Sequence, residues 1–384
     1  MKRSLQFFAS LSFALVASSA LSQAVAYVYV ANNPKNSSTN EVTAFAAEPN
    51  GKLKTVFGSP FREDVQTMAV DGSHLVAVNR SQPNIDTFTI ESGGALRYQA
   101  STNYASHAPN EDCPVANQIF FDHTGSDLYV QEFNSDCATN TGVASFTLNK
   151  TSGKLHYLGL DNTGAFPGDN NAAYFTGNNK YAYTAVNSDC MYYSIYGFKR
   201  SSSGLLAGLS QAVANLPAPP PNFRRYIPDL VAADPYNNVA VLMQPANPPG
   251  CSSEPLQIAT YTASSSGVLR TKSTYADMPA TQIATPHDMK MSPSGKLLAI
   301  AGEEGVQVFF WNESAGAARY TGLLTKAPIN QIFWDNSDHL YGISQATNKL
   351  YVFKVTPTHT SHAPGSPYPV SDPQHLIVQP LEHR

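Results

Sequence analysis

The stretch YVYVAN at residues 27–32, with the segments that follow it, sets the pattern of the whole chain. A polar loop leads to EVTAFAAE at 41–48, an Asn50-Gly51 turn, KLKTVF at 52–57 and GSPF at 58–61. Alternating β-branched and aromatic residues predict a strand in each apolar segment, and the Gly, Asn and Pro clusters between them predict turns. The stretch therefore predicts three consecutive antiparallel strands.

The core of this pattern is an apolar residue, two spacers and an aromatic residue, and it returns roughly every 50 residues, as repeat architectures require. The seven pairs are Val42/Phe45, Ile85/Phe88, Val143/Phe146, Ile195/Phe198, Ile258/Tyr261, Val306/Phe309 and Leu350/Phe353. Each pair marks the third strand of a predicted four-stranded unit. Repeated antiparallel units of this size predict an all-β fold, a β-propeller.

The two ends of the chain decide the number of blades. The N-terminal unit lacks a first strand, because Tyr27 already belongs to the second strand. The segment Pro373–Gln379 has first-strand character and no blade after it. We therefore expect one propeller domain over residues 27–384, with seven blades of four strands. The C-terminal strand would complete the N-terminal blade and remove the exposed edges of an open ring.

YVYVAN, the turn SPSGKLLAIA at 292–301, the S-G-x-L turns and GSPF resemble the lactonase-type seven-bladed propellers. That family includes 6-phosphogluconolactonase-like proteins and YVTN-repeat surface proteins. The resemblance covers the chain from residue 27 onward, and it implies the fold more strongly than the activity. Family enzymes commonly carry paired histidines before a first strand. The matching stretch here, residues 111–117, has none, and only Pro286-His287-Asp288 is similar.

The first 26 residues have the pattern of a secretory signal peptide. Lys2-Arg3 precede an apolar run, and small residues follow, so we expect cleavage after Ala26, with Ser22 as the alternative. The pattern predicts a periplasmic or secreted protein. No later segment approaches the roughly 18 apolar residues of a membrane span. The net charge of −4 gives no basic stripe that would indicate nucleic acid or an anionic membrane surface.

Four cysteines in an exported chain predict two disulfides. We expect Cys113–Cys137 and Cys190–Cys251, because each pair falls in neighbouring upper loops. A Cys137–Cys190 bridge is the alternative, but it would leave Cys113 two blades from Cys251. No Cys or His spacing indicates a metal site, and no motif predicts a cofactor. We expect a monomer.

The candidate site lies at the upper mouth of the predicted central channel. Five residues before each inner-strand turn stand polar side chains: Gln66, Asn117, Asn171, Asp229, His287, Asn330 and Gln374. One position later comes a mixed set that includes Asp288 and His375. These groups could hydrogen-bond to one another and to water. Alternatively they form a pocket for a carbohydrate or lactone ligand.

The sequence favours a non-catalytic binding scaffold, whose upper loops and channel mouth hold a small ligand or a protein partner. The alternative is an extracytoplasmic lactonase. Lactone opening needs a base and a cation near the oxyanion, and His287 or Asp229 could act as base and Arg225 as the cation. His107 and Glu132 are weaker candidates. A sugar-phosphate substrate does not suit an exported protein, and the sequence contains no other catalytic motif.

Overall fold

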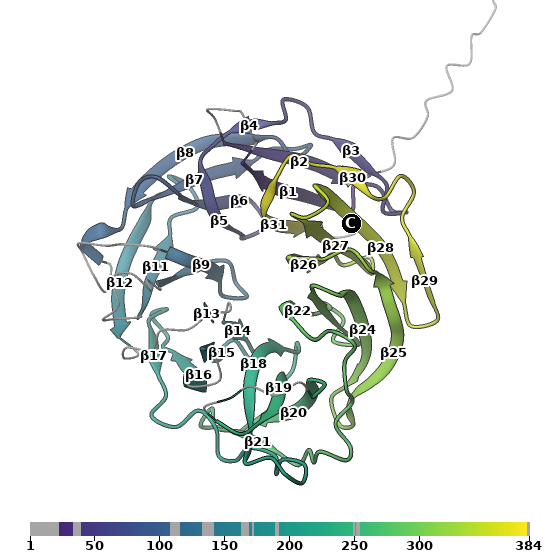
Figure 1. The fold of residues 1–384 in the computed structure, drawn as a ribbon. Coiled ribbons are helices and arrows are strands. Elements are labelled where there is room, and N and C mark those ends of the chain that lie inside the picture. Colours follow the sequence, from purple (N-terminus) through teal and green to yellow (C-terminus); the bar gives the residue numbers. More distant parts are fainter. Residues whose placement is uncertain are drawn as a thin grey trace, which may run out of the picture.

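The structure is a computed structural model, and it describes residues 23–33, 40–107, 116–132, 142–162, 169–170, 173–188, 192–248, 250 and 254–381. Seven antiparallel sheets surround a central axis, and Figure 1 shows them as the blades of a ring. The seven-bladed propeller predicted from the repeat is confirmed. Apart from one turn of 3-10 helix, η1 (Ala105–His107), the described elements are strands.

The first four blades follow the order of the chain, and the strands of each blade are named from the channel outward. Blade 1 contains β31 (Pro373–Pro380), β1 (Ala26–Asn32), β2 (Glu41–Ala47) and β3 (Leu53–Thr55), with β4 (Phe61–Arg62) added to β2. Blade 2 contains β5 (Val65–Val70), β6 (His74–Asn79), β7 (Asn84–Ile90) and β8 (Leu96–Asn103). Blade 3 contains β9 (Ala116–Phe121), β10 (Asp127–Glu132), β11 (Gly142–Leu148) and β12 (Leu155–Asn162). Blade 4 contains β13 (Asp169–Asn170) and β14 (Tyr174–Phe175), then β15 (Tyr181–Ser188), β16 (Tyr192–Arg200) and β17 (Leu206–Gly208).

The other three blades repeat the arrangement. Blade 5 contains β18 (Arg225–Ala233), β19 (Asn238–Ala246), β20 (Gln257–Ala263) and β21 (Leu269–Thr271). Blade 6 contains β22 (Pro286–Met291), β23 (Leu297–Gly302), β24 (Gly305–Asn312) and β25 (Gly316–Thr325). Blade 7 contains β26 (Gln331–Trp334), β27 (His339–Ser344), β28 (Lys349–Thr356) and β29 (His359–His362), with β30 (Tyr368–Pro369) added to β28.

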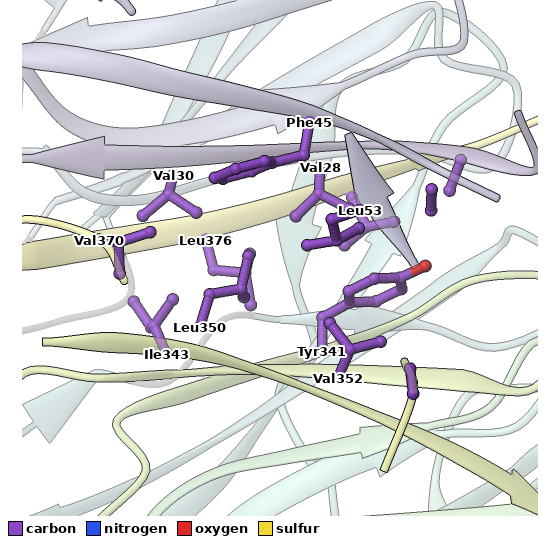
Figure 2. Close-up of a cluster of buried hydrophobic side chains, with 14 of the residues drawn as sticks. Val28, Val30, Phe45, Leu53, Tyr341, Ile343, Leu350, Val352, Val370 and Leu376 are labelled. Carbon is purple, nitrogen blue, oxygen red and sulfur yellow. The ribbon is translucent and has the colours of Figure 1, made fainter. Parts of the chain in front are cut away.

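The last strand closes the ring as the sequence predicted. β31 pairs with β1 in antiparallel register, from Ala26↔Pro380 to Asn32↔Pro373. Leu376 and Val378 of β31 pack with Val28 and Val30 of β1 against the apolar residues of blade 7 (Figure 2). The first and last blades therefore share one hydrophobic core.

The structured part of the chain reaches upstream of Tyr27. Val25 is 3% exposed and Ala26 is fully buried, and both belong to the core that joins blades 1 and 7. The backbone N–H of Val25 donates to Ala47, and the carbonyl of Val25 accepts from Leu381. Signal cleavage after Ala26 would remove these contacts, whereas cleavage after Ser22 would keep them.

Antiparallel order gives the ring two different faces. The turns between first and second strands, and between third and fourth strands, lie together on one face, which we call the underside. The connections between second and third strands, and between blades, lie on the opposite, upper face. Carboxylates hold the inner turns of the underside, as at Asp122, which accepts from the backbone N–H groups of Ser126 and Asp127 at 3.0 Å.

Candidate functional site

The inner strands bulge where the sequence places its polar ring. In five blades the pairing with the second strand skips one residue, and these residues are Gln66, Asn117, Asp229, His287 and Gln374. A bulge leaves the extra residue out of the ladder and turns its side chain, and bulges are common beside binding sites. In blade 7, Asn330 lies just before β26, and its side-chain oxygen accepts from the Gln345 N–H at 2.9 Å.

A cavity of about 300 Å³ lies at the channel mouth. Of the predicted residues, Gln66, His287, Asp288, Asn330, Gln374 and His375 line it. The other lining side chains include Gln118, Gln331, Gln345, Tyr174 and Lys290. The inner strands and the loops beside them thus bring six amide side chains, two histidines and one Asp/Lys pair to a single cavity.

Lys290 is the central charge of this cavity, and the sequence analysis did not single it out. Its Nζ donates to Asp288 Oδ1 at 2.9 Å and to the hydroxyl of Tyr174, which comes from blade 4 across the channel. It also lies over the rings of Tyr174 and Phe333, 4.8 and 4.9 Å from their centroids. Burial alone would lower the pKa of Lys290, but Asp288 and Tyr174 outweigh burial and raise the pKa above its ordinary value. The side chain is therefore a fixed ammonium ion.

Asp288 is held in place by three groups. Its Oδ2 accepts from the Ile332 N–H at 2.9 Å, and its Oδ1 accepts from the Met289 N–H as well as from Lys290. The Asp/Lys pair thus ties β22 of blade 6 to β26 of blade 7 and to β14 of blade 4. Both charges are satisfied inside the protein, and the net charge of the pair is zero.

His375 on β31 is a buried, neutral histidine in the same cavity. It is 6% exposed, and its Nε2 lies 3.2 Å from the Thr67 hydroxyl. Its Nδ1 is buried without a hydrogen-bond partner among the described residues. Burial lowers the pKa of His375 to about 3, with the Lys290 charge adding to the effect. A buried polar atom without a partner is unusual, and His375 is one of the residues that line the cavity.

This histidine predicts a pH-dependent loss of stability. Above pH 6.5, the ordinary pKa, His375 is neutral in both states and has no effect. As the pH falls from 6.5 toward 3, the unfolded chain binds a proton that the folded protein does not. Folding stability should then drop by about 1.4 kcal/mol per pH unit from this residue. Urea unfolding across that range should show a shallower pH dependence for His375→Gln than for the parent. His359→Gln, at an exposed position on β29, is the control, and parallel curves for the parent and His375→Gln would contradict the assignment.

His287 lies at the mouth with both ring nitrogens engaged. Nδ1 is 3.2 Å from the carbonyl oxygen of Ile329, and Nε2 is 3.1 Å from Glu303 Oε1. A ring held between a carbonyl and a carboxylate presents no lone pair to a substrate. The geometry supports a positioning contact at the mouth more than a general base.

The other predicted residues lie at different distances from the cavity. Asp229 is at the bulge of β18, and its neighbours Leu230 and Val231 line the cavity, but Asp229 is not among the lining residues that the structure describes. Arg225 begins β18 and is exposed at its upper end, paired in register with Ala246. His107 stacks on Tyr157 of the outer strand β12, at 4.0 Å, away from the channel. The catalytic roles assigned to these residues stay predictions.

Several predicted residues fall on parts of the chain that the structure does not describe. Asn171 and the four cysteines, Cys113, Cys137, Cys190 and Cys251, lie outside the described residues. For Asn117 and Glu132 only the backbone is described. Both disulfide pairings therefore stay predictions. Within the described ranges, no three His, Cys, Asp or Glu side chains are placed to hold a metal ion.

A larger groove of about 510 Å³ lies on the outer side of the ring, between β20 and β21 of blade 5 and the start of β25. Thr260, Thr271 and Gly316 are among its lining residues. We favour the smaller central cavity as the functional site because the inner strands converge on it and because it holds a buried charged pair and an unpartnered histidine nitrogen.

Comparison with known proteins supports the fold. No family model matches the sequence, and no curated protein matches it. A proposed 6-phosphogluconolactonase from Bacteroides uniformis superposes with a TM-score of 0.67 at 14% identity, over 93% of this chain and 100% of its own. The periplasmic gluconolactonase of Pseudomonas aeruginosa gives a TM-score of 0.50 at 14% identity, over 92% of this chain and 85% of its own.

Propellers with other roles match as well. Chaetomium thermophilum Sqt1, bound to the N-terminus of ribosomal protein L10, gives a TM-score of 0.50 at 12% identity, over 86% of this chain and 83% of its own. The chain therefore has the fold of the lactonase-like seven-bladed propellers, and the fold alone does not decide the function. Among the described residues, no helix has the length and apolar character needed to cross a membrane.

Proposed function

We propose that this chain is a binding module whose channel mouth holds a small, uncharged, polyhydroxylated molecule, such as a sugar or a sugar lactone. The observation that carries the proposal is the charge balance of the cavity. Lys290 is the only lysine or arginine among the described lining residues, and Asp288 compensates it at 2.9 Å. No cationic charge is left over for a phosphate or a carboxylate, which proteins bind with unpaired Arg or Lys.

The amides supply the hydrogen bonds that hydroxyl groups need. Gln66, Gln118 and Gln345 have no side-chain partner among the described residues, so each offers both a carbonyl oxygen and an NH₂ group. Gln331 accepts from the Leu376 N–H at 2.6 Å and keeps its NH₂ group for a ligand. This supports recognition of several hydroxyls at once. We further propose that the protein acts outside the cytoplasm, on the evidence of its N-terminal pattern.

Calorimetric titration with D-glucose, D-gluconolactone and 6-phosphogluconolactone tests the proposal. We expect one of the uncharged compounds to bind, and the phosphorylated one to bind at least about tenfold more weakly, because a buried site without a free cation must desolvate the phosphate. Gln66→Leu should weaken binding by a similar factor while the melting temperature stays near that of the parent. Gln211→Leu, on the exposed outer surface, is the control. Tighter binding of the phosphorylated lactone would refute the proposal.

Lactone hydrolysis is the second candidate, and one observation favours it. When His375 Nε2 donates to Thr67, Nδ1 keeps a lone pair, and His375 and Lys290 both line the cavity. Catalysis through these groups would require the imidazole to accept a proton from water despite its low pKa, and Lys290 to turn from Asp288 toward the oxyanion. Turnover of D-gluconolactone that His375→Gln abolishes without loss of binding would favour the enzyme. Binding without turnover would favour the module.

A further inference from the structure

Four lysines from three separate segments of blades 3 and 4 lie together on the underside. They form no basic stripe in the sequence. Lys150 and Lys154 lie in the turn between β11 and β12, Lys180 precedes β15, and Lys199 lies near the end of β16. All four are exposed. We call this group the underside lysines. The two blades adjoin at this place, because Asn179 of blade 4 donates to Asp122 of blade 3 and Arg200 of blade 4 pairs with Asp127 of blade 3.

Among the described residues, no exposed acid forms an ion pair with these lysines. Two carboxylates of blade 3 on this face, Asp122 and Asp127, are 3% and 4% exposed, and Arg200 lies within ion-pair distance of both. Lys150 lies 3.5 Å from the buried Asp71. Lys154, Lys180 and Lys199 have no carboxylate within ion-pair distance among the described residues. Elsewhere on the underside, by contrast, Glu48 and Glu91 pair with Lys54 and Arg97.

The surface around these lysines is built from short turns. The four underside connections of blades 3 and 4 run from the end of one strand to the start of the next over residues 122–126, 149–154, 176–180 and 201–205. Tyr236 of blade 5 borders the patch, since its carbonyl accepts from Gly177, and its own side chain is 53% exposed. Tyrosine is one of the residues enriched at membrane interfaces, and lysines near an anionic membrane surface are attracted to it.

We propose that the underside of blades 3 and 4 docks on an anionic lipid surface. Lysines near an anionic bilayer each contribute to binding, and the effect is screened by salt. The turns are short and the charges are spread over two blades, which fits a planar partner. The channel mouth opens on the opposite face, so a docked protein would present its cavity to the solvent. The proposal does not depend on the function of that cavity.

Vesicle sedimentation tests the proposal directly. We expect the protein to sediment with vesicles of phosphatidylcholine and phosphatidylglycerol at low ionic strength, and not with phosphatidylcholine alone or at high ionic strength. The variant K150E/K154E/K180E/K199E should lose about tenfold or more of its partitioning. The control R62E/R224E/K326E/K349E makes the same change of charge at four exposed residues near the upper face and should partition much closer to the parent.

Each other outcome would overturn the proposal. Equal losses in the two variants would show that net charge alone matters. Absence of salt-sensitive binding to the anionic vesicles would exclude the lipid partner. Binding to immobilised heparin without binding to vesicles would assign the patch to a polyanionic chain instead. Thermal melting of both variants beside the parent shows that lost binding does not come from unfolding.

Discussion

A protein that ends at Asp372 should fail to form the native ring. The truncation removes β31, the inner strand of blade 1, and with it the ladder that pairs β31 with β1 along its whole length. Leu376 is fully buried, and Ile377 and Val378 are 6% and 3% exposed. Truncating one such side chain to alanine costs about 2–5 kcal/mol. Losing three of them, with the ladder, approaches the roughly 5–15 kcal/mol that stabilises a typical protein.

The truncation would also affect residues outside β31. Leu376 and Val378 belong to the core that also holds Tyr341 and Val352 of blade 7, and Figure 2 shows Leu376 between the residues of the two blades. His375 would also be lost from the channel mouth. We therefore expect the truncated protein to lose the cooperative thermal transition of the parent, measured by circular dichroism.

Two milder changes keep this prediction testable if the truncated chain does not fold at all. Leu376→Ala should lower the free energy of unfolding by about 2–5 kcal/mol, and removal of residues 382–384 should leave it nearly unchanged. A synthetic peptide of residues 373–381 should restore a cooperative transition to the truncated chain. A truncated protein that melts like the parent would show that β31 is not needed to close the ring.

The ring could be predicted from the sequence because its determinants are local. Alternation, short turns and the repeated aromatic residue fix each strand within a few positions, and the missing first strand before Tyr27 matches the extra strand at Pro373. The number of predicted strands then implies that the C-terminal strand closes the ring. The alignment of the inner strands also located the polar mouth, and five of its seven positions coincide with bulges.

Lys290 was missed because those bulges change the alternation. Side chains alternate along a regular strand, so the sequence predicts that Met289 faces the channel together with His287. The bulge at His287 reverses the count. Met289 borders the cavity but packs with Leu298 and Phe309 in the core between blades 5 and 6, whereas Lys290 bonds to Asp288 and Tyr174. The contact between Lys290 and Tyr174 joins residues 116 positions apart, and it depends on the diameter of the ring, which no local pattern encodes.

The same reliance on local sequence patterns explains why three residues were grouped as a predicted catalytic set. Asp229 was grouped with His287 because the two residues occupy equivalent positions in their blades. Arg225 was added because it shortly precedes Asp229. The strand β18 is nine residues long, so Arg225 lies at its exposed upper end while the cavity begins at Leu230. Residue type and the alignment of the inner strands identified the face of the ring on which these residues lie. How deep each residue lies in the channel depends on the length of its strand.

Breaking the pair of Lys290 and Asp288 should be the most destabilising point change in the cavity. Lys290→Met leaves the Asp288 carboxylate buried beside β26, and Asp288→Asn leaves the ammonium ion without its counter-charge. Removing one partner of a buried pair costs about 3–5 kcal/mol, because the remaining charge has lost its solvation. Urea unfolding of each single variant at neutral pH measures the loss.

The double variant Lys290→Met with Asp288→Asn decides whether the two side chains act as a unit. It contains neither charge, and the carbonyl oxygen of the introduced amide can still accept from the Ile332 N–H. Its cost should therefore be well below the sum of the two single costs, with a coupling of about 0.5–3 kcal/mol, as for residues in contact. Additive costs would show that Lys290 does not depend on Asp288. In that case the ammonium would be free to attract an anion, and the cavity would suit a phosphorylated or carboxylated ligand rather than an uncharged one.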